Sequence, residues 1–192
     1  MCETGSVSMA YFYFDIRDID KQSRHGLLTS LLTQLSARSD AFCDILSRLY
    51  KAHDDGARHP SSRALTQCPK EMLTLPDHGP VYFILDALDE CPNEGTPSAR
   101  KLVLDLIEDL VWLGLPSLHL CVTSRPEVDI INSLHSVSSH HVSLHDKSGQ
   151  RKDIAEYVRS VVHSNRHGVM KKWRADDIEL VIKTLSERAD GM

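Results

Sequence analysis

The sequence predicts an α/β fold with three layers, in which helices lie on both faces of a mainly parallel sheet. Short, mainly apolar runs occur at residues 9–14, 81–85 and 118–122, and the run at 81–85 has no polar face, a pattern typical of a strand buried on both sides. Longer segments between them repeat their apolar residues at helical spacing. Strands that alternate with helices form right-handed crossovers, which place neighbouring strands in parallel.

The first strand and the first helix are predicted from two contrasting patterns. Residues 9–14 are continuous and rich in aromatic side chains, which favours a strand. Leucines then recur on one helical face between residues 27 and 35, which predicts an amphipathic helix. Ser23 stands in the right place to cap the N-terminus of that helix.

Two more helices are expected before the second strand. Residues 42–50 place apolar side chains on one face, and either Ser39 or Asp40 can cap this helix. Residues 61–75 show a similar pattern that is interrupted by Pro69. Because proline removes a backbone donor and clashes with the preceding turn, we expect a kink or a restart of the helix there.

The second half of the chain continues the alternation. We expect helices at residues 98–112, 127–134, 150–162 and 176–188, and strands at residues 118–122 and 140–144. The whole chain, residues 1–192, is interpreted as part of one domain, and residues 146–192 as its helical segment.

Composition excludes several classes of function. The formal net charge of −5 and the pI near 6.1 provide no general attraction to nucleic acid or to anionic lipid. No apolar run approaches the ~20 residues that a membrane span requires. The five cysteines are odd in number and contain no C-x-x-C pair, which favours free thiols in a reducing compartment. We therefore expect a cytoplasmic protein that binds neither nucleic acid nor membrane.

The most informative stretch is the apolar run at residues 81–85 with the acidic residues that follow it. Asp86, Asp89 and Glu90 gather at the carboxyl end of a predicted central strand, where open α/β sheets bind ligands. Several carboxylates in one place need a compensating cation. Mg²⁺ is suited to this, since it takes carboxylate oxygens and keeps several waters. The alternative is a core strand that runs into an ordinary acidic loop.

A second group of polar residues follows the strand predicted at residues 118–122. Thr123, Ser124 and Arg125 come directly after it, at the same edge of the sheet if the strands are parallel. Carboxylates beside a hydroxyl pair and a guanidinium match the needs of phosphoryl transfer, in which metal and arginine offset the charge of the terminal phosphate. The alternative for Arg125 is a helix-entry residue paired with a surface carboxylate.

At these residues the chain resembles a known family. Residues 81–90 resemble the Walker B strand of the NACHT branch of the STAND P-loop NTPases, and residues 118–126 resemble its sensor-1 strand, which ends in Thr-Ser-Arg-Pro. Residues 10–18 and 142–158 and the terminal Arg-Ala-Asp-Gly-Met extend the likeness over nearly the whole chain. In this order the segments are similar to the nephrocystin 3-like N-terminal modules of fungal NLR-type proteins.

The resemblance implies a P-loop NTPase core and a role for each site residue. Asp86 would hold Mg²⁺, mostly through water, and Asp89 or Glu90 would position or activate the hydrolytic water. Arg125 would sense the γ-phosphate, with Thr123 and Ser124 beside the nucleotide. The family consists of ATP-hydrolysing switches in which ADP holds a closed form and ATP favours an open, self-associating form. The choice between ATP and GTP stays open.

One departure from the family pattern limits this expectation. A Walker A loop supplies the backbone N–H groups and the lysine that cradle the phosphates, and this chain contains no Gly-Lys pair. In the family that loop precedes the strand matched by residues 9–14, so we expect a domain that is incomplete at its N-terminus and stops short of further helices. We therefore expect this polypeptide to bind ATP weakly or not at all and to show no measurable hydrolysis.

Two other functions compete with the nucleotide switch. The chain could be a non-catalytic interaction fragment that associates with intact NACHT proteins, which a pull-down without nucleotide dependence would favour. It could also belong to a different ATPase class such as the helicases, whose acidic strand is similar. The absence of a Ser-Ala-Thr type motif and of a basic surface argues against the helicase.

Overall fold

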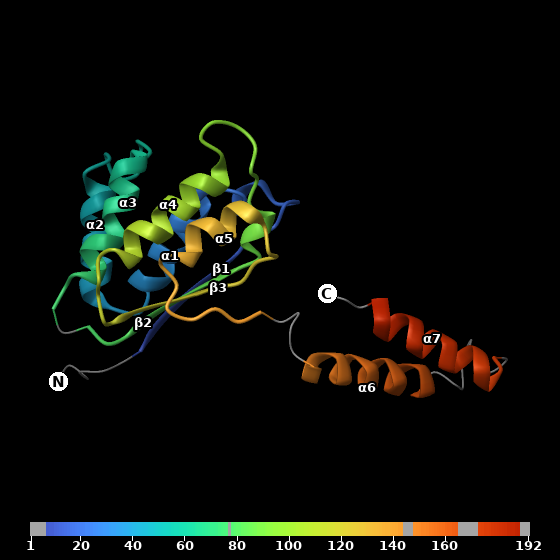
Figure 1. Ribbon diagram of the computed structural model, residues 1–192. Helices are drawn as coiled ribbons and strands as arrows, with labels where there is room; N and C mark the ends of the chain where they lie inside the picture. The colour runs from blue at the N-terminus through green and yellow to red at the C-terminus, as the bar shows by residue number, and fades with distance from the viewer. Residues whose placement is uncertain (1–6, 77, 144–147, 165–172, 189–192) are drawn as a thin grey trace. The chain divides into compact units, whose positions relative to one another are not determined.

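The computed structural model describes residues 7–76, 78–143, 148–164 and 173–188 of the chain (Figure 1). Contacts within the chain divide it into two compact units, Met1–Ser138 and Ser139–Met192. The first unit contains the sheet and the second contains two helices. Each unit is described by itself.

The sheet of the first unit has three parallel strands in the order of the sequence. These are β1 (Ser8–Tyr13), β2 (Val81–Asp86) and β3 (Leu118–Val122), with β2 in the centre. Leu85 of β2 is in register with Phe12 on one side and with Val122 on the other. The carboxyl ends of the strands therefore meet at one edge, and the mixed α/β class predicted from the sequence is confirmed.

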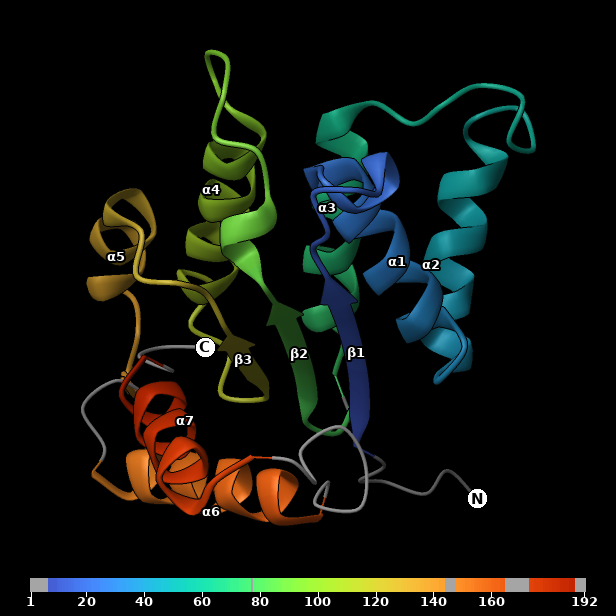
Figure 2. The same cartoon turned by 90° about the vertical axis from the view of Figure 1, so that its right-hand side faces the viewer.

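Five helices and two short 3-10 turns complete the first unit (Figure 2). They are η1 (Ile19–Lys21), α1 (Arg24–Ser36), α2 (Asp40–Lys51), α3 (Ser62–Leu73), η2 (Leu88–Glu90), α4 (Ala99–Val111) and α5 (Val128–His135). The predicted cap of α1 is confirmed, because the Ser23 hydroxyl accepts a hydrogen bond from the N–H of Gly26. Ser39 occupies the cap position of α2 without a side-chain bond.

Helix α3 runs through Pro69 without a restart. The pyrrolidine ring is buried with the apolar face of the helix, next to Cys68 and in line with Leu65 and Met72. Of the two expected outcomes, a kink or a restart, the restart is therefore wrong. Burial of the ring in the core contributes a favourable term that offsets part of the lost backbone hydrogen bond.

The core of the first unit lies between one face of the sheet and helices α1 to α5. Its fully buried side chains include Leu27, Leu28, Leu31, Leu32 and Leu35 of α1, Phe83 and Leu85 of β2, and Val103, Leu106 and Ile107 of α4. Each such side chain contributes about 1.5–3 kcal/mol through removal from water. The leucine spacing of α1 was the sequence signal that predicted this packing.

The other face of the sheet is exposed, which corrects the prediction that the strands are buried on both sides. Burial alternates along β1 and β2, so that Met9, Tyr11 and Tyr13 are about half exposed and Tyr82 is 40% exposed. Helices α1 and α4 lie over the opposite face (Figure 1). Tyrosine tolerates this position because its ring is apolar and its hydroxyl is hydrated.

A side-chain amide of α1 closes part of the outer edge of β1. The Gln34 Nε2 group donates to the carbonyl of Tyr11 over 2.8 Å, and Gln34 Oε1 accepts the N–H of Tyr11 over 3.1 Å. The amide thus replaces a neighbouring strand at this residue. Capping of this kind reduces the exposure of unpaired backbone groups on an edge strand.

The fourth strand, predicted at residues 140–144, is not formed in the part of it that the structure describes. Residues 140–143 carry no strand, and Leu144 lies outside the described residues. An extended segment becomes a strand only where its N–H and C=O groups pair with a neighbour. In the described part of the sheet, the ladders join only β1, β2 and β3.

The second unit is a pair of helices, α6 (Ser148–Ser164) and α7 (Ala175–Arg188). Both helices were predicted from their apolar spacing. They pack through a small cluster formed by Val162, Ile178 and Ile182, with Val158 partly buried beside it. Among the helices that the structure describes, none is long and apolar enough to cross a membrane.

Candidate functional site

The candidate site lies at the carboxyl edge of β2 and β3, which we call the rim. Asp86 is the last residue of β2, and Thr123 follows the last residue of β3. The Thr123 hydroxyl donates a hydrogen bond to the Asp86 carboxylate and accepts one from the N–H of Ala87 over 3.1 Å. Parallel pairing therefore brings together two residues that are 37 positions apart in the sequence.

A second link joins the same two strand ends. The carboxylate of Asp89 accepts the backbone N–H of Arg125 over 3.0 Å and lies 3.5 Å from Nε of the same residue. The Asp89 side chain is only 10% exposed, whereas that of Arg125 is 79% exposed. Arg125 is thus anchored at its backbone while its guanidinium group still reaches solvent, where it can meet an anion.

Glu90 and Ser124 are not brought to the same place. The Glu90 carboxylate points to the loop after β1 and accepts the N–H of Ile16 over 3.1 Å. The hydroxyl of Ser124 donates to the carbonyl of its neighbour Arg125 over 2.7 Å. Two pairs therefore form across the carboxyl ends of β2 and β3, Asp86 with Thr123 and Asp89 with Arg125, and the other two predicted residues lie outside them.

The chain bends sharply at the end of β2. Ala87 has φ +55° and ψ 46°, a left-handed conformation that is uncommon for a residue other than glycine. The 3-10 turn η2 follows, with Leu88 fully buried beneath it. This bend lets both Asp86 and Asp89 turn toward the end of β3, although residues three apart on a continuous strand point to opposite faces.

A buried arginine donates hydrogen bonds to the backbone of this turn, and it was not predicted from the sequence. Arg100, in the first turn of α4, is 8% exposed. It donates to the carbonyls of Asp89 over 2.6 Å and Cys91 over 2.9 Å, and it lies 3.3 Å from the carboxylate of Asp129 in α5. A charged residue at the start of a predicted helix is common, so its position alone was no signal of burial.

Another charged pair lies after β1. Arg17 donates to the Asp15 carboxylate from its backbone N–H, from Nε and from Nη2, each at about 3 Å. These hydrogen bonds lower the pKa of Asp15 to about 2. The Arg17 side chain is 86% exposed, so the pair folds the loop locally and is separate from the rim.

The cysteine next to the acidic turn provides no nucleophile. Cys91 is fully buried, and its thiol donates a weak hydrogen bond to the carbonyl of Gln22 over 3.5 Å. Burial raises the pKa of Cys91 to about 11. The thiolate is the reactive form of cysteine, so this side chain is inert at neutral pH.

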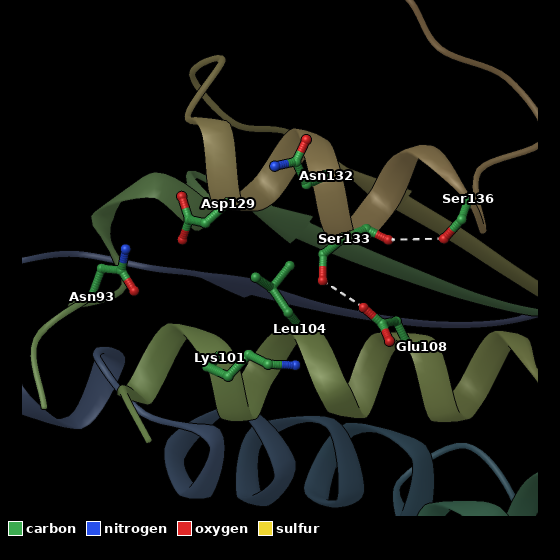
Figure 3. A pocket seen from close by; sticks show the side chains of 8 residues that line it. All are labelled: Asn93, Lys101, Leu104, Glu108, Asp129, Asn132, Ser133 and Ser136. Carbon is green, nitrogen blue, oxygen red and sulfur yellow. Dashed lines mark hydrogen bonds between the residues drawn. The ribbon is translucent and has the colours of Figure 1, made fainter. Parts of the chain in front are cut away.

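A polar groove of about 410 Å³ lies between α4 and α5 (Figure 3). Leu104 lies in the middle of it, and its charged lining residues already have partners. Lys101 pairs with Asp105, Asp129 with Arg100, and Glu108 accepts a hydrogen bond from Ser133. A groove whose charges are already paired has little left to bind an ionic ligand. The rim, with its exposed guanidinium group, is therefore the better candidate.

The residues at the rim can hold a hydrated metal ion only with help from a ligand. Among the residues that the structure describes, no group of three or more His, Cys, Asp or Glu side chains is arranged to bind a metal. At the rim, the Asp89 carboxylate is paired with the exposed Arg125 guanidinium, and the Asp86 carboxylate accepts the Thr123 hydroxyl. Mg²⁺ commonly binds through one or two carboxylates together with water and substrate phosphates, so the rim fits a phosphate-borne Mg²⁺ rather than a metal site made only of protein.

Comparison with known families finds a match. The family model described as Nephrocystin 3, N-terminal matches residues 1–125, which is more than half of the chain. The chain belongs to this family. The matched part of the nephrocystin 3 N-terminal family ends at Arg125 and so includes all three strands and the whole rim. The chain has no significant match among curated proteins or among solved structures.

Proposed function

We propose that the rim binds the phosphate groups of a Mg²⁺-bound nucleoside triphosphate, and that the chain is part of a NACHT-type nucleotide-controlled signalling switch in the cytoplasm. The observation that carries this proposal is the presence of two bonded pairs, Asp86 with Thr123 and Asp89 with Arg125, at the carboxyl edge of two parallel strands. Ligands of open α/β sheets bind at this edge. The family membership supports it, because nephrocystin 3-like modules resemble P-loop NTPases.

Each of these pairs has a chemical task in this proposal. Asp86 is the side chain that would hold Mg²⁺, which supplies positive charge to the phosphate oxygens when it is bound. Arg125 would approach the terminal phosphate, since a guanidinium group matches phosphate geometry with paired donors. Thr123 fixes the orientation of the Asp86 carboxylate through its hydroxyl.

The arrangement favours binding over hydrolysis. A general base must be free to accept a proton from the attacking water. Here the Asp89 carboxylate is bound to Arg125, and the Glu90 carboxylate is bound to the N–H of Ile16. Both predicted catalytic carboxylates already accept hydrogen bonds within the chain, and the sequence has no Gly-Lys pair of a phosphate loop, so we propose that the chain alone does not hydrolyse nucleotide at a measurable rate.

The experiment is a titration of the chain with Mg-ATP, followed by the amide chemical shifts of Arg125 and of the acidic turn. Without a Gly-Lys phosphate loop we expect a Kd of about 1 mM, equivalent to roughly −4 kcal/mol. Arg125→Met and Asp86→Asn should remove most of the chemical-shift change, whereas Lys101→Met, in the groove between α4 and α5, should not.

Two results would contradict this proposal. An absence of any ATP-dependent change at the rim at 10 mM nucleotide, about ten times the expected Kd, would exclude the phosphate site. Micromolar affinity that Asp86→Ala abolishes would show that the phosphate loop is dispensable and that the predicted weakness is wrong. A parallel titration with Mg-GTP distinguishes the two nucleotides.

The exposed face of the sheet favours a second candidate function, that of an interaction module. Met9, Tyr11, Tyr13 and Tyr82 expose apolar surface on one face of neighbouring strands. Aromatic residues are enriched at protein interfaces. A pull-down with an intact NACHT protein that is lost in Tyr11→Ser and unaffected by nucleotide would support this function, in agreement with self-association in the family.

A further inference from the structure

The acidic turn, β3 and α5 are joined by a closed series of contacts that passes through Arg100. The exposed Arg125 is bound by the carboxylate of Asp89, and the carbonyl of the same Asp89 is bound by Arg100. Arg100 also pairs with Asp129, which lies in α5 just after the segment that begins at Arg125. Asp89 is thus bound on one side by a solvent-exposed arginine and on the other by a buried one.

The geometry requires a guanidinium group at this position. Nε of Arg100 donates to the carbonyl of Cys91, Nη2 donates to the carbonyl of Asp89, and Nη1 donates to the carboxylate of Asp129. One planar group thus serves three acceptors in two segments, the acidic turn and α5. A lysine ammonium is a compact point charge and cannot reproduce this fork. Because the Arg100 side chain is only 9% exposed, loss of the group would leave two carbonyls and a carboxylate without their donor.

We propose that Arg100 is a positioning residue that locks the segment between β3 and α5 onto the acidic turn, and thereby holds the Arg125 guanidinium at the rim. The role of Arg100 in ordering the rim is inferred from its contacts alone. The further step, in which the ordered Arg125 binds a phosphate group, rests on the proposed function.

The proposal is tested by amide hydrogen exchange in Arg100→Met and Arg100→Lys. The probes are the amides of Arg125, of Glu127, whose N–H donates to the carbonyl of Arg125, and of Cys91, whose N–H donates to Leu88. We expect their exchange to rise about tenfold or more, while the α1 amide of Leu31 changes by less than about threefold, because the loss is local rather than global.

Lys101→Met is the matched control. Lys101 is the next residue of α4 and carries the same charge, but its ammonium pairs with Asp105 on the helix surface. This variant should leave all four amides as in the parent chain. Arg100→Lys keeps the charge and is the milder variant if Arg100→Met does not fold, and it should still loosen the turn because the fork is lost.

The outcomes separate the two proposals. If the amide exchange rates of Leu31 and of the rim rise equally, Arg100 stabilises the fold as a whole and the positioning role is overturned. Unchanged exchange rates at the rim would also overturn it. A Mg-ATP titration forms the second part of the test, in which Arg100→Lys should weaken binding about tenfold if the parent chain binds. Failure of the parent chain to bind ATP would count against the proposed function, and the exchange data alone would then decide on Arg100.

Discussion

The two faces of the sheet are built from the same kinds of residue but have opposite environments. On the covered face Phe83 is 1% exposed, while on the open face its neighbour Tyr82 is 40% exposed. The covered face packs against leucine-rich helices, and the open face is occupied by tyrosines with polar tips. The covered face therefore contributes most of the stability of the fold. The open face stays hydrated, and its side chains are accessible to a protein partner.

The largest expected effect compares these two adjacent residues of β2. Phe83→Ala should lower the free energy of unfolding by about 3–5 kcal/mol, because it creates a cavity in the core. Tyr82→Ala should lower it by about 1 kcal/mol or less, since it removes only a half-exposed ring and its stacking on His119. Urea unfolding monitored by circular dichroism measures both values. Similar losses for the two variants would show that the open face is covered in solution.

A smaller effect is expected where α1 reaches the edge of β1. Gln34→Ala removes two hydrogen bonds to the backbone of Tyr11 and should cost about 1–2 kcal/mol. It should also accelerate hydrogen exchange at the Tyr11 amide. On the open face, Tyr11 is thus held through its backbone and not by packing of its half-exposed ring.

Thr33→Ala is the matched control for Gln34. Its hydroxyl donates to the carbonyl of Thr29 within the same helix, so its removal should leave the Tyr11 amide unchanged. If the control accelerates exchange at Tyr11 as much as Gln34→Ala does, the contact across the strand edge is not what protects it.

The smallest expected effect concerns the loop beyond β1, which belongs to neither face. The hydrogen bonds from Arg17 lower the pKa of Asp15 from 3.8 to about 2. A carboxylate with a lowered folded-state pKa stabilises the fold above its unfolded pKa and loses this contribution as the pH falls through the folded value. The contribution should therefore be fully present above about pH 4 and decline toward pH 2.

Asp15→Asn tests this pH dependence directly. The variant should be less stable than the parent chain at neutral pH, and the difference between the two unfolding midpoints should shrink as the pH is lowered from 4 to 2. A constant difference over this interval would show that Asp15 does not titrate with the fold. Both proteins are compared at equal ionic strength, since the pair is exposed and screened by salt.

The meeting of Asp86 and Thr123 could be predicted from the sequence because it depends only on strand order. Each residue directly follows an apolar run, and parallel neighbours place such residues at one edge. Separation of Glu90 and Asp89 could not be predicted in this way. It depends on the left-handed bend at Ala87, a residue type that rarely adopts this conformation and so carries no signal.

The burial of the strands and the burial of Arg100 could not be predicted from the sequence, for different reasons. A continuous apolar run does not reveal which of its faces a helix covers, and the tyrosines at positions 11, 13 and 82 suit either environment. Arg100 is buried because carbonyls from another segment surround it, and sequence spacing does not report such tertiary contacts. The buried face of α1, in contrast, could be predicted because its leucines recur at helical spacing within one short segment.

The bend at Ala87 has a consequence for how the acidic turn tolerates change. Asp89 reaches Arg125 because two residues separate it from Asp86, and the buried Leu88 fixes the rotation of this short connection. An inserted or deleted residue would rotate the carboxylate away from its partner even if every acidic residue were retained. In this segment the length of the connection is therefore fixed together with the acidic side chains and the buried Leu88.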